Sequence, residues 1–404
     1  MLKLFKVLCS GIGAAGATFL LQILLSHQLS MHQFGVYVAV NSSLTMIGPF
    51  AGMGVGGLFL RKACVDEIKI KEYFSIALRC LFINITLAFI ISQFIFLNTG
   101  LNVTQAVFLS TYYLPVSLQY LVISYAQASD NFLKVSVAQI INPFLRVLLV
   151  FFLFIFLPSL TNTIILLGIA NILSFGILLQ LIRQSLSFNL LFLKQSKENF
   201  FSFFKESFFY SFNGTINVIQ IQFSVLIAMY FFGSDASGLY SSAIILLTAC
   251  YILPNIIFGT YLLPQYHKLE KRVLKNQSIK HAIIAFLFGF LFFVIISISS
   301  EFVINILYPN SFKYSALLLN ILASSLPFRF FSTAIGAALL NEKCIKYKVS
   351  ASFLALVFQI ILMFFLSGIG TKSISISFVI SEVITSILYT GIFLKYFQNK
   401  TINK

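Results

Sequence analysis

Three charged residues lie inside stretches of the sequence that are apolar enough to cross a membrane: Arg146, Arg329 and Glu382. An arginine at the centre of a bilayer costs at least about 2.5–3.5 kcal/mol on insertion scales, so it requires a partner or a polar cavity. A guanidinium can also donate two parallel hydrogen bonds to phosphate oxygens. Arg329 follows Pro327, a helix-interrupting residue, by two positions. The sequence therefore favours Arg329 as a cavity-facing binding site for an anion.

The remaining charged positions leave alternatives open. Arg146 could bind the same anion, but it could also snorkel toward the membrane surface or form an internal salt bridge. Arg61, at the end of an expected helix, is either a further anion candidate or an anchor at the cytoplasmic surface. Glu382 could carry a coupling proton or cation, or it could be the counter-ion of Arg329.

Polar side chains also form stripes along expected membrane helices. Asn213, Asn217 and Gln220 are spaced by four and three residues, which places them on one face of a helix. Such residues often form hydrogen bonds between helices. Because stripes occur on several helices at once, we instead expect them to line a shared water-filled cavity that takes a polar substrate. The candidate lining residues are Gln22, Asn41, Asn213, Asn217, Gln220 and Asn255.

Composition defines the class of protein that must position these residues. Apolar residues make up 59% of the chain and charged residues 9%, whereas soluble domains carry roughly 25% charged residues. Apolar runs of about 20 residues recur along the chain, the length of a membrane-spanning helix. They are continuous rather than alternating, which excludes a β-barrel. The sequence predicts an all-α integral membrane protein.

Twelve membrane helices are expected. They span residues 7–26, 36–60, 73–97, 104–127, 135–157, 162–183, 208–232, 239–263, 281–299, 314–340, 347–367 and 373–395. Lys and Arg then fall almost entirely in the loops of one side, which predicts that both termini are cytoplasmic. The net charge of +16 comes from these short loops, so nucleic acid is not an expected partner.

The two halves of the chain repeat each other. Gly35 and Tyr37 recur 203 residues later as Gly238 and Tyr240, each time before a helix that contains a proline. Six helices per half is an even number, so the repeat is parallel. The sequence predicts an N-terminal six-helix bundle (1–184), a cytoplasmic connecting segment (185–207) and a C-terminal six-helix bundle (208–404). Helix breaks are expected at Pro49, Pro115, Pro254 and Pro327.

Signatures of enzymes are missing from the sequence. It contains no Asp-x-Asp motif, no Gly-rich phosphate loop and no His/Cys cluster, and only 11 acidic residues in total. Neither catalytic residues nor a metal or other cofactor is expected.

Four short motifs carry a family resemblance. They are Gln33-Phe34-Gly35-Val36-Tyr37, the glycine-rich Gly54–Arg61 segment, Gly238-Leu239-Tyr240 and Glu301–Tyr308. With these motifs the chain resembles the Wzx-type polysaccharide flippases of the MATE/MOP transporter superfamily, along essentially its whole length. One departure is His32-Gln33, which replaces the acidic residues usual before Phe34.

The resemblance implies a function in the bacterial inner membrane. A Wzx-type flippase moves an undecaprenyl-pyrophosphate-linked oligosaccharide, an O-antigen or capsule repeat unit, from the cytoplasmic to the periplasmic leaflet by alternating access. Arg329, Arg146 and Arg61 would bind the pyrophosphate, and a polysaccharide polymerase and a chain-length regulator are potential partners. A flippase is needed because an unpartnered sugar hydroxyl costs roughly 4–8 kcal/mol in hydrocarbon.

Two rival functions remain. A cation-coupled small-molecule exporter of the same superfamily would share the fold, but the scarcity of acidic residues disfavours a site for organic cations. A membrane polysaccharide polymerase or glycosyltransferase would be expected to show a large outer loop or an acidic motif, and neither occurs in this sequence.

Overall fold

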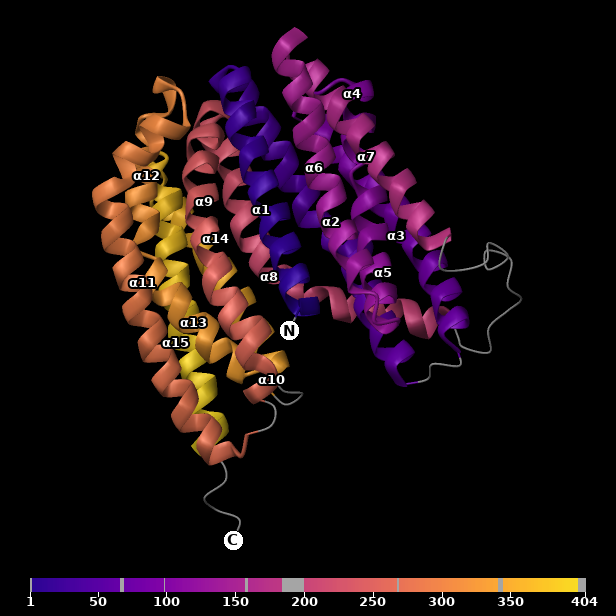
Figure 1. The fold of residues 1–404 in the computed structure, drawn as a ribbon. Helices are drawn as coiled ribbons and strands as arrows, with labels where there is room; N and C mark the ends of the chain where they lie inside the picture. The colour runs from indigo at the N-terminus through magenta and orange to yellow at the C-terminus, as the bar shows by residue number, and fades with distance from the viewer. Residues whose placement is uncertain are drawn as a thin grey trace. The chain divides into compact units, whose positions relative to one another are not determined.

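The structure, a computed structural model, describes residues 2–65, 69–97, 99–156, 159–183, 200–266, 269–340 and 344–398. Within these ranges all regular structure is helical (Figure 1). Eleven of the described helices are long and apolar enough to cross a membrane, and a bent helix pair makes a twelfth span. The expected all-α fold with about twelve membrane helices is therefore confirmed. The cytoplasmic placement of the termini remains a prediction.

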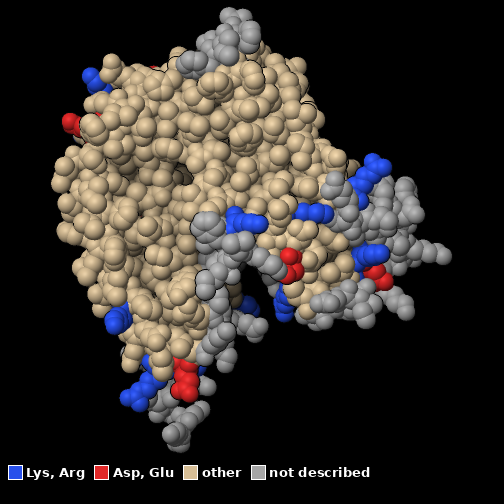
Figure 2. All heavy atoms as spheres, in the orientation of Figure 1, with Lys and Arg blue, Asp and Glu red and all other residues tan. Residues whose placement is uncertain are grey.

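The distribution of charge fits a membrane protein. On the face drawn in Figure 2 most described atoms belong to uncharged residues. Large apolar side chains such as Phe82, Phe94 and Ile298 are 71–82% exposed. Exposed apolar area of this extent is stable only where lipid, rather than water, surrounds the helices.

The chain divides into two compact units, residues 1–223 and 224–404. The division falls inside helix α8 (Phe200–Phe232), which begins eight residues before the expected helix 208–232. Most of the expected connecting segment, residues 184–199, lies outside the described residues. The expected bundle boundaries at 184 and 208 therefore remain predictions.

Unit 1 is built from seven helices besides its part of α8. They are α1 (Leu2–Gln28), α2 (Met31–Val65), α3 (Ile70–Leu97), α4 (Val103–Ser110), α5 (Tyr113–Ala128), α6 (Phe132–Phe156) and α7 (Leu160–Arg183). Helix α2 packs on α3 and α5, α1 packs on α6, and α7 packs on α4, α5 and α6.

Unit 2 contains the C-terminal part of α8, from Ser224 onward, and a second series of helices. Its elements are α9 (Ser234–Pro254), the π-helix η3 (Asn255–Leu262), α10 (Leu263–Tyr266), α11 (Lys271–Leu307), α12 (Tyr314–Ala323), α13 (Leu326–Ala338), α14 (Ile345–Phe365) and α15 (Lys372–Gln398). Short 3-10 turns lie at Asn310–Phe312 (η4) and Ser367–Ile369 (η5). The contacts of α3 and α7 with α5 recur as contacts of α11 and α15 with α13, and the α6–α7 contact recurs as α14–α15. Part of the packing therefore repeats with the sequence.

The four prolines have different local structures. Pro115 lies in the first turn of α5 and Pro327 in the first turn of α13, where an N–H would lack a helical partner anyway. The chain bends by 43° between α12 and α13. Pro254 ends α9, and the chain continues as the π-helix η3. Pro49, in contrast, lies inside an uninterrupted α2.

Glycines bring α2 and α5 into close contact. A Cβ atom added to Gly52 would lie 2.5 Å from the Ser117 Cα, and one added to Gly56 would lie 2.8 Å from the Tyr120 carbonyl oxygen. Small residues at such a crossing let two membrane helices approach backbone to backbone. The contact fixes α5, and with it the break between α4 and α5 that precedes Tyr113.

Candidate functional site

Arg146 forms the centre of a polar cluster in unit 1. It projects from α6 and is only 8% exposed. Its Nη2 donates a hydrogen bond to the Asn41 Oδ1 on α2, at 3.4 Å. The guanidinium lies over the Tyr112 ring, 5.5 Å from the ring centroid, at the break between α4 and α5. Two membrane helices and one helix break therefore converge on this arginine.

The Arg146 cluster contains polar atoms that lack partners. The Tyr37 hydroxyl and the Arg146 Nε are buried without a hydrogen-bond partner among the described residues. Tyr37 and Tyr112 are both close enough to interact electrostatically with the guanidinium. No carboxylate in the described part of the chain forms an ion pair with Arg146. This arrangement leaves a buried positive charge that an anion would stabilise.

Arg329 in unit 2 has a different environment. Its Nη1 donates to the Glu382 Oε1 at 3.2 Å, which joins α13 to α15. The guanidinium also lies over the Tyr251 ring of α9, 4.9 Å from the ring centroid. Arg329 and Glu382 are 8% and 1% exposed. Of the alternatives that the sequence left open for Glu382, the structure places it as the counter-ion of Arg329.

Further polar residues surround this ion pair. The Lys348 Nζ donates to the Gly336 carbonyl oxygen at 3.0 Å and lies 5.6 Å from the Tyr389 ring centroid. The Tyr389 hydroxyl is 2.6 Å from the Ser352 Oγ. The sequence analysis proposed no site role for Lys348 or Tyr112. Lys348 follows Lys343 and Lys346 in the sequence and lies half-buried in the first turn of α14, so its position beside the ion pair had no signal in the sequence.

The expected cavity-lining residues differ in burial. Gln22 is 6% exposed, and its Oε1 has no hydrogen-bond partner among the described residues. Gln220 is also buried, Asn41 and Asn217 are half-buried, and Asn255 is exposed at the start of η3. The side chain of Asn213 lies outside what the structure describes. Arg61 is exposed near the end of α2, away from the Arg146 cluster.

Other polar side chains link helices within a unit. In unit 2 the Gln359 Nε2 donates to the Ser224 Oγ at 2.6 Å, and the Ser381 Oγ donates to the Gln359 Oε1 at 3.1 Å. In unit 1 the Asn142 Nδ2 donates to the Asn171 Oδ1 at 3.2 Å. For these residues the alternative reading of polar stripes, as helix–helix hydrogen bonds, describes the structure.

Metal binding finds no support in the described residues, where no group of three or more His, Cys, Asp or Glu side chains could hold an ion. Among the described residues each unit has one buried arginine as its candidate functional residue. One is neutralised by a carboxylate, and the other is surrounded by an amide and two tyrosines.

Solved structures of membrane transporters and of a flippase share this helical fold. The structure resembles an inward-facing multidrug resistance MATE family transporter of the MOP superfamily, with a TM-score of 0.72, 12% identity and 96% of each chain covered. It resembles the lipid II flippase MurJ equally well, with a TM-score of 0.72, 14% identity, and 98% and 90% of the two chains covered. The eukaryotic MATE transporter AtDTX14 gives a TM-score of 0.68 at 12% identity, with 98% and 94% covered. At these identities the likeness concerns the fold alone.

The family follows from the sequence itself. Residues 3–270 match the family described as polysaccharide biosynthesis protein, and this chain belongs to that family. No curated protein matches the chain. Family and fold together make it a multi-pass membrane protein with the fold of flippases and transporters rather than of enzymes.

Proposed function

We propose that this protein flips an undecaprenyl-pyrophosphate-linked oligosaccharide, an O-antigen or capsule repeat unit, from the cytoplasmic to the periplasmic leaflet of a bacterial inner membrane. Membership in a polysaccharide biosynthesis family supports a glycan cargo. The fold shared with a lipid II flippase supports transfer of a lipid-linked molecule. Both termini would be cytoplasmic, and a polymerase and a chain-length regulator would act on the exported product.

The observation that carries the proposal is the unpaired charge of Arg146. The guanidinium is 8% exposed, and no carboxylate in the described residues neutralises it. A pyrophosphate would supply the missing negative charge and accept hydrogen bonds from the guanidinium. We therefore assign the anion to Arg146 ahead of Arg329, whose charge Glu382 already balances. Arg61 would attract the same anion at the membrane surface.

Sugar recognition and movement complete the proposal. Gln22, Asn41, Asn217 and Gln220, with Asn213 and Asn255, would exchange hydrogen bonds with sugar hydroxyls. The helix interruptions at Pro254 and Pro327, together with Pro49, would allow the helices to bend as each unit exposes its polar residues first to one side of the membrane and then to the other. Glu382 would take up a coupling proton or cation only when its pairing with Arg329 opens.

A reconstituted flipping assay tests this function. Arg146→Gln should slow the transfer of a fluorescent lipid-linked oligosaccharide across proteoliposomes at least about tenfold, because a charge-assisted hydrogen bond contributes roughly 1.5–3 kcal/mol. Arg146→Lys should keep part of the activity, since it retains the charge but loses the bidentate geometry. Arg79→Gln, which removes an exposed arginine of the same unit, is the matched control. Transfer at the normal rate by Arg146→Gln would refute the anion site.

The rival function, a cation-coupled exporter of small molecules, is favoured by the equal likeness to a MATE transporter. It predicts that cells carrying this protein expel a lipophilic cationic dye, and that Glu382→Gln abolishes the expulsion. We expect no dye efflux above that of cells lacking the protein. Efflux that depends on Glu382 would replace the flippase proposal.

A further inference from the structure

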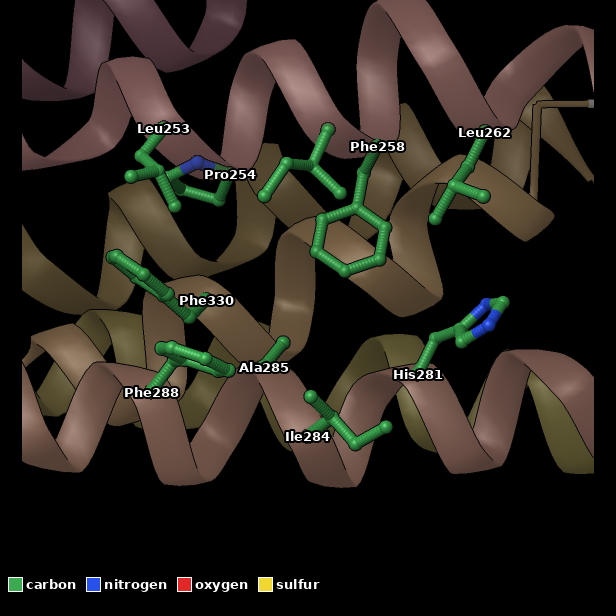
Figure 3. Close-up of a pocket in the computed structure, with 10 residues that line it drawn as sticks. Leu253, Pro254, Phe258, Leu262, His281, Ile284, Ala285, Phe288 and Phe330 are labelled. Carbon is green, nitrogen blue, oxygen red and sulfur yellow. The ribbon is translucent and has the colours of Figure 1, made fainter.

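An apolar groove lies in unit 2 between α9, η3 and α11 (Figure 3). Its volume is about 170 Å³, and nine of the ten lining residues are apolar. The lining residues are Leu253, Pro254, Ile257, Phe258, Leu262, His281, Ile284, Ala285, Phe288 and Phe330. His281 and Leu262 lie toward one end of the groove in Figure 3, and Pro254, Phe288 and Phe330 toward the other.

The groove exists because the α9 helix changes its winding at Pro254. The proline cannot donate a backbone hydrogen bond, and the next eight residues form the wider π-helix η3. On the facing helix, Ala285 leaves room where a larger side chain would fill the space. Leu253, Ile257 and Phe288 are 43%, 38% and 52% exposed, so the groove opens at the surface of the unit and is not enclosed within it.

Basic residues lie beyond the His281 end of the groove. Helix α11 has 37 residues, a length of about 55 Å at 1.5 Å per residue, which exceeds the roughly 30 Å hydrocarbon layer. Its first turns, which precede the apolar stretch, carry Lys271, Arg272, Lys275 and Lys280 against one acid, Glu270. Figure 2 shows basic side chains at the lower end of unit 2, where α11 begins in Figure 1.

His281 marks the boundary between the two regions. Its Nδ1 is 2.8 Å from the Tyr266 hydroxyl, and the two rings stack with an interplanar angle of 13°. From His281 to Phe288 the groove follows α11 for about 10 Å, which is two-thirds of one leaflet of hydrocarbon, about 15 Å. Along α11 the basic first turns, the polar boundary at His281 and an apolar groove about two-thirds of a leaflet deep thus follow one another.

We propose that this groove binds one acyl chain of an anionic phospholipid, with the lipid headgroup on the basic first turns of α11. Arg272, Lys275 and Lys280 attract the negative headgroup, and the apolar groove takes the chain out of the bulk bilayer. The charge selects against zwitterionic lipids, since each basic residue near the surface favours anionic lipid by about 1 kcal/mol, or roughly fivefold. This site does not depend on the proposed flippase activity.

The absence of tryptophan from the sequence allows a direct test. Phe288→Trp places a single fluorescent reporter in the groove. Phe290→Trp, at a position that is 50% exposed on the same helix but outside the groove, is the matched control. Both variants of the full chain are reconstituted in phosphatidylcholine bilayers that contain a minor fraction of phosphatidylglycerol, and either lipid carries brominated, quenching acyl chains.

Brominated phosphatidylglycerol should quench the fluorescence of the Phe288→Trp reporter several-fold more than its fraction of the bilayer lipid predicts. Quenching of the Phe290→Trp reporter should match the bulk lipid composition. Adding Arg272→Gln, Lys275→Gln and Lys280→Gln should remove the preference, roughly fivefold per charge. Ile284→Trp, one turn nearer the basic end, repeats the measurement if Phe288→Trp does not fold. Equal quenching by both lipids, a preference that survives the three Gln changes, or displacement of phosphatidylglycerol by a small amount of polyprenyl phosphate would each overturn the assignment.

Discussion

The two units differ most at one helix crossing that the repeat makes equivalent. The offset of 203 residues that relates Tyr37 to Tyr240 also relates Gly48 to Tyr251. The offset of 212 residues that relates Pro115 to Pro327 also relates Ser117 to Arg329. In unit 1 this crossing is a close contact of glycines on α2 with α5. In unit 2 the same crossing holds an arginine over a tyrosine ring.

This difference separates a buried charge that is neutralised by a carboxylate from one that is not. Unit 2 introduces Arg329 at the crossing and balances it with Glu382 from a third helix, so the group is neutral as a whole. Unit 1 keeps its crossing free of charged side chains among the described residues and carries its arginine on α6, where Asn41 and Tyr112 hold it without neutralising it. A buried pair ties helices together, whereas a buried unpaired charge is stabilised by a bound anion.

The largest expected effect comes from breaking the buried pair. Glu382→Ala leaves Arg329 buried without a counter-ion, which should destabilise unit 2 by about 3–5 kcal/mol. The amount of folded protein in the membrane and its thermal unfolding midpoint should therefore fall sharply. Arg329→Ala should have a similar effect, because it leaves the carboxylate uncompensated.

The double variant Arg329→Met with Glu382→Leu is the control for that prediction. Replacing both charges by apolar groups of similar size should restore abundance and the unfolding midpoint close to normal. Loss of transport in a double variant that is present at normal abundance would show that Arg329 acts on the substrate. Arg329 and Arg146 would then no longer differ in role between the two units.

The fold could be predicted from the sequence because its signals are local and strong. Apolar runs and proline positions located the membrane helices, although α8 and α11 begin eight and ten residues before the expected starts at 208 and 281. The continuity of α2 through Pro49 was not predictable, because the packing of its glycines against α5 compensates for one lost backbone hydrogen bond. Such compensation depends on a partner helix about 65 residues away in the chain.

A moderate effect is expected from the glycine contact. Gly56→Ala places a Cβ atom 2.8 Å from the Tyr120 carbonyl oxygen, so α2 and α5 must move apart at a cost of about 1–3 kcal/mol. Gly259 is its equivalent in unit 2 by the 203-residue offset, and no atom lies within 4 Å of a Cβ added there. Gly259→Ala should leave the unfolding midpoint nearly unchanged. Equal losses at both positions would show that the glycines serve helix flexibility rather than close packing.

The candidate site was only partly predictable. The rarity of charge in the expected helices identified Arg146, Arg329 and Glu382, but sequence position alone did not reveal which arginine is paired. Whether an arginine is paired depends on how α13 is rotated relative to α15. The spacing of residues in the sequence gives the orientation of a helix face only approximately, so it does not predict the pairing. Tyr251 lies on a polar stripe of the expected helix 239–263, but its position beneath Arg329 was not predicted. Tyr112 was not identified because an aromatic residue in an aromatic-rich membrane protein carries no special signal.

The smallest expected effect concerns the tyrosine rings beneath the two arginines. Tyr112→Phe and Tyr251→Phe keep the ring and should change little. Pentafluorophenylalanine at either position keeps the shape of phenylalanine but removes the negative ring face, an interaction of about 0.5–2 kcal/mol. The Arg329 guanidinium retains its carboxylate at 3.2 Å, so position 251 should tolerate the change. Arg146 has only the Asn41 amide as a further partner among the described residues, so position 112 should lose more stability and more substrate transport. An equal loss at both positions would mean that Arg146 is as well compensated as Arg329, and that the anion must bind elsewhere.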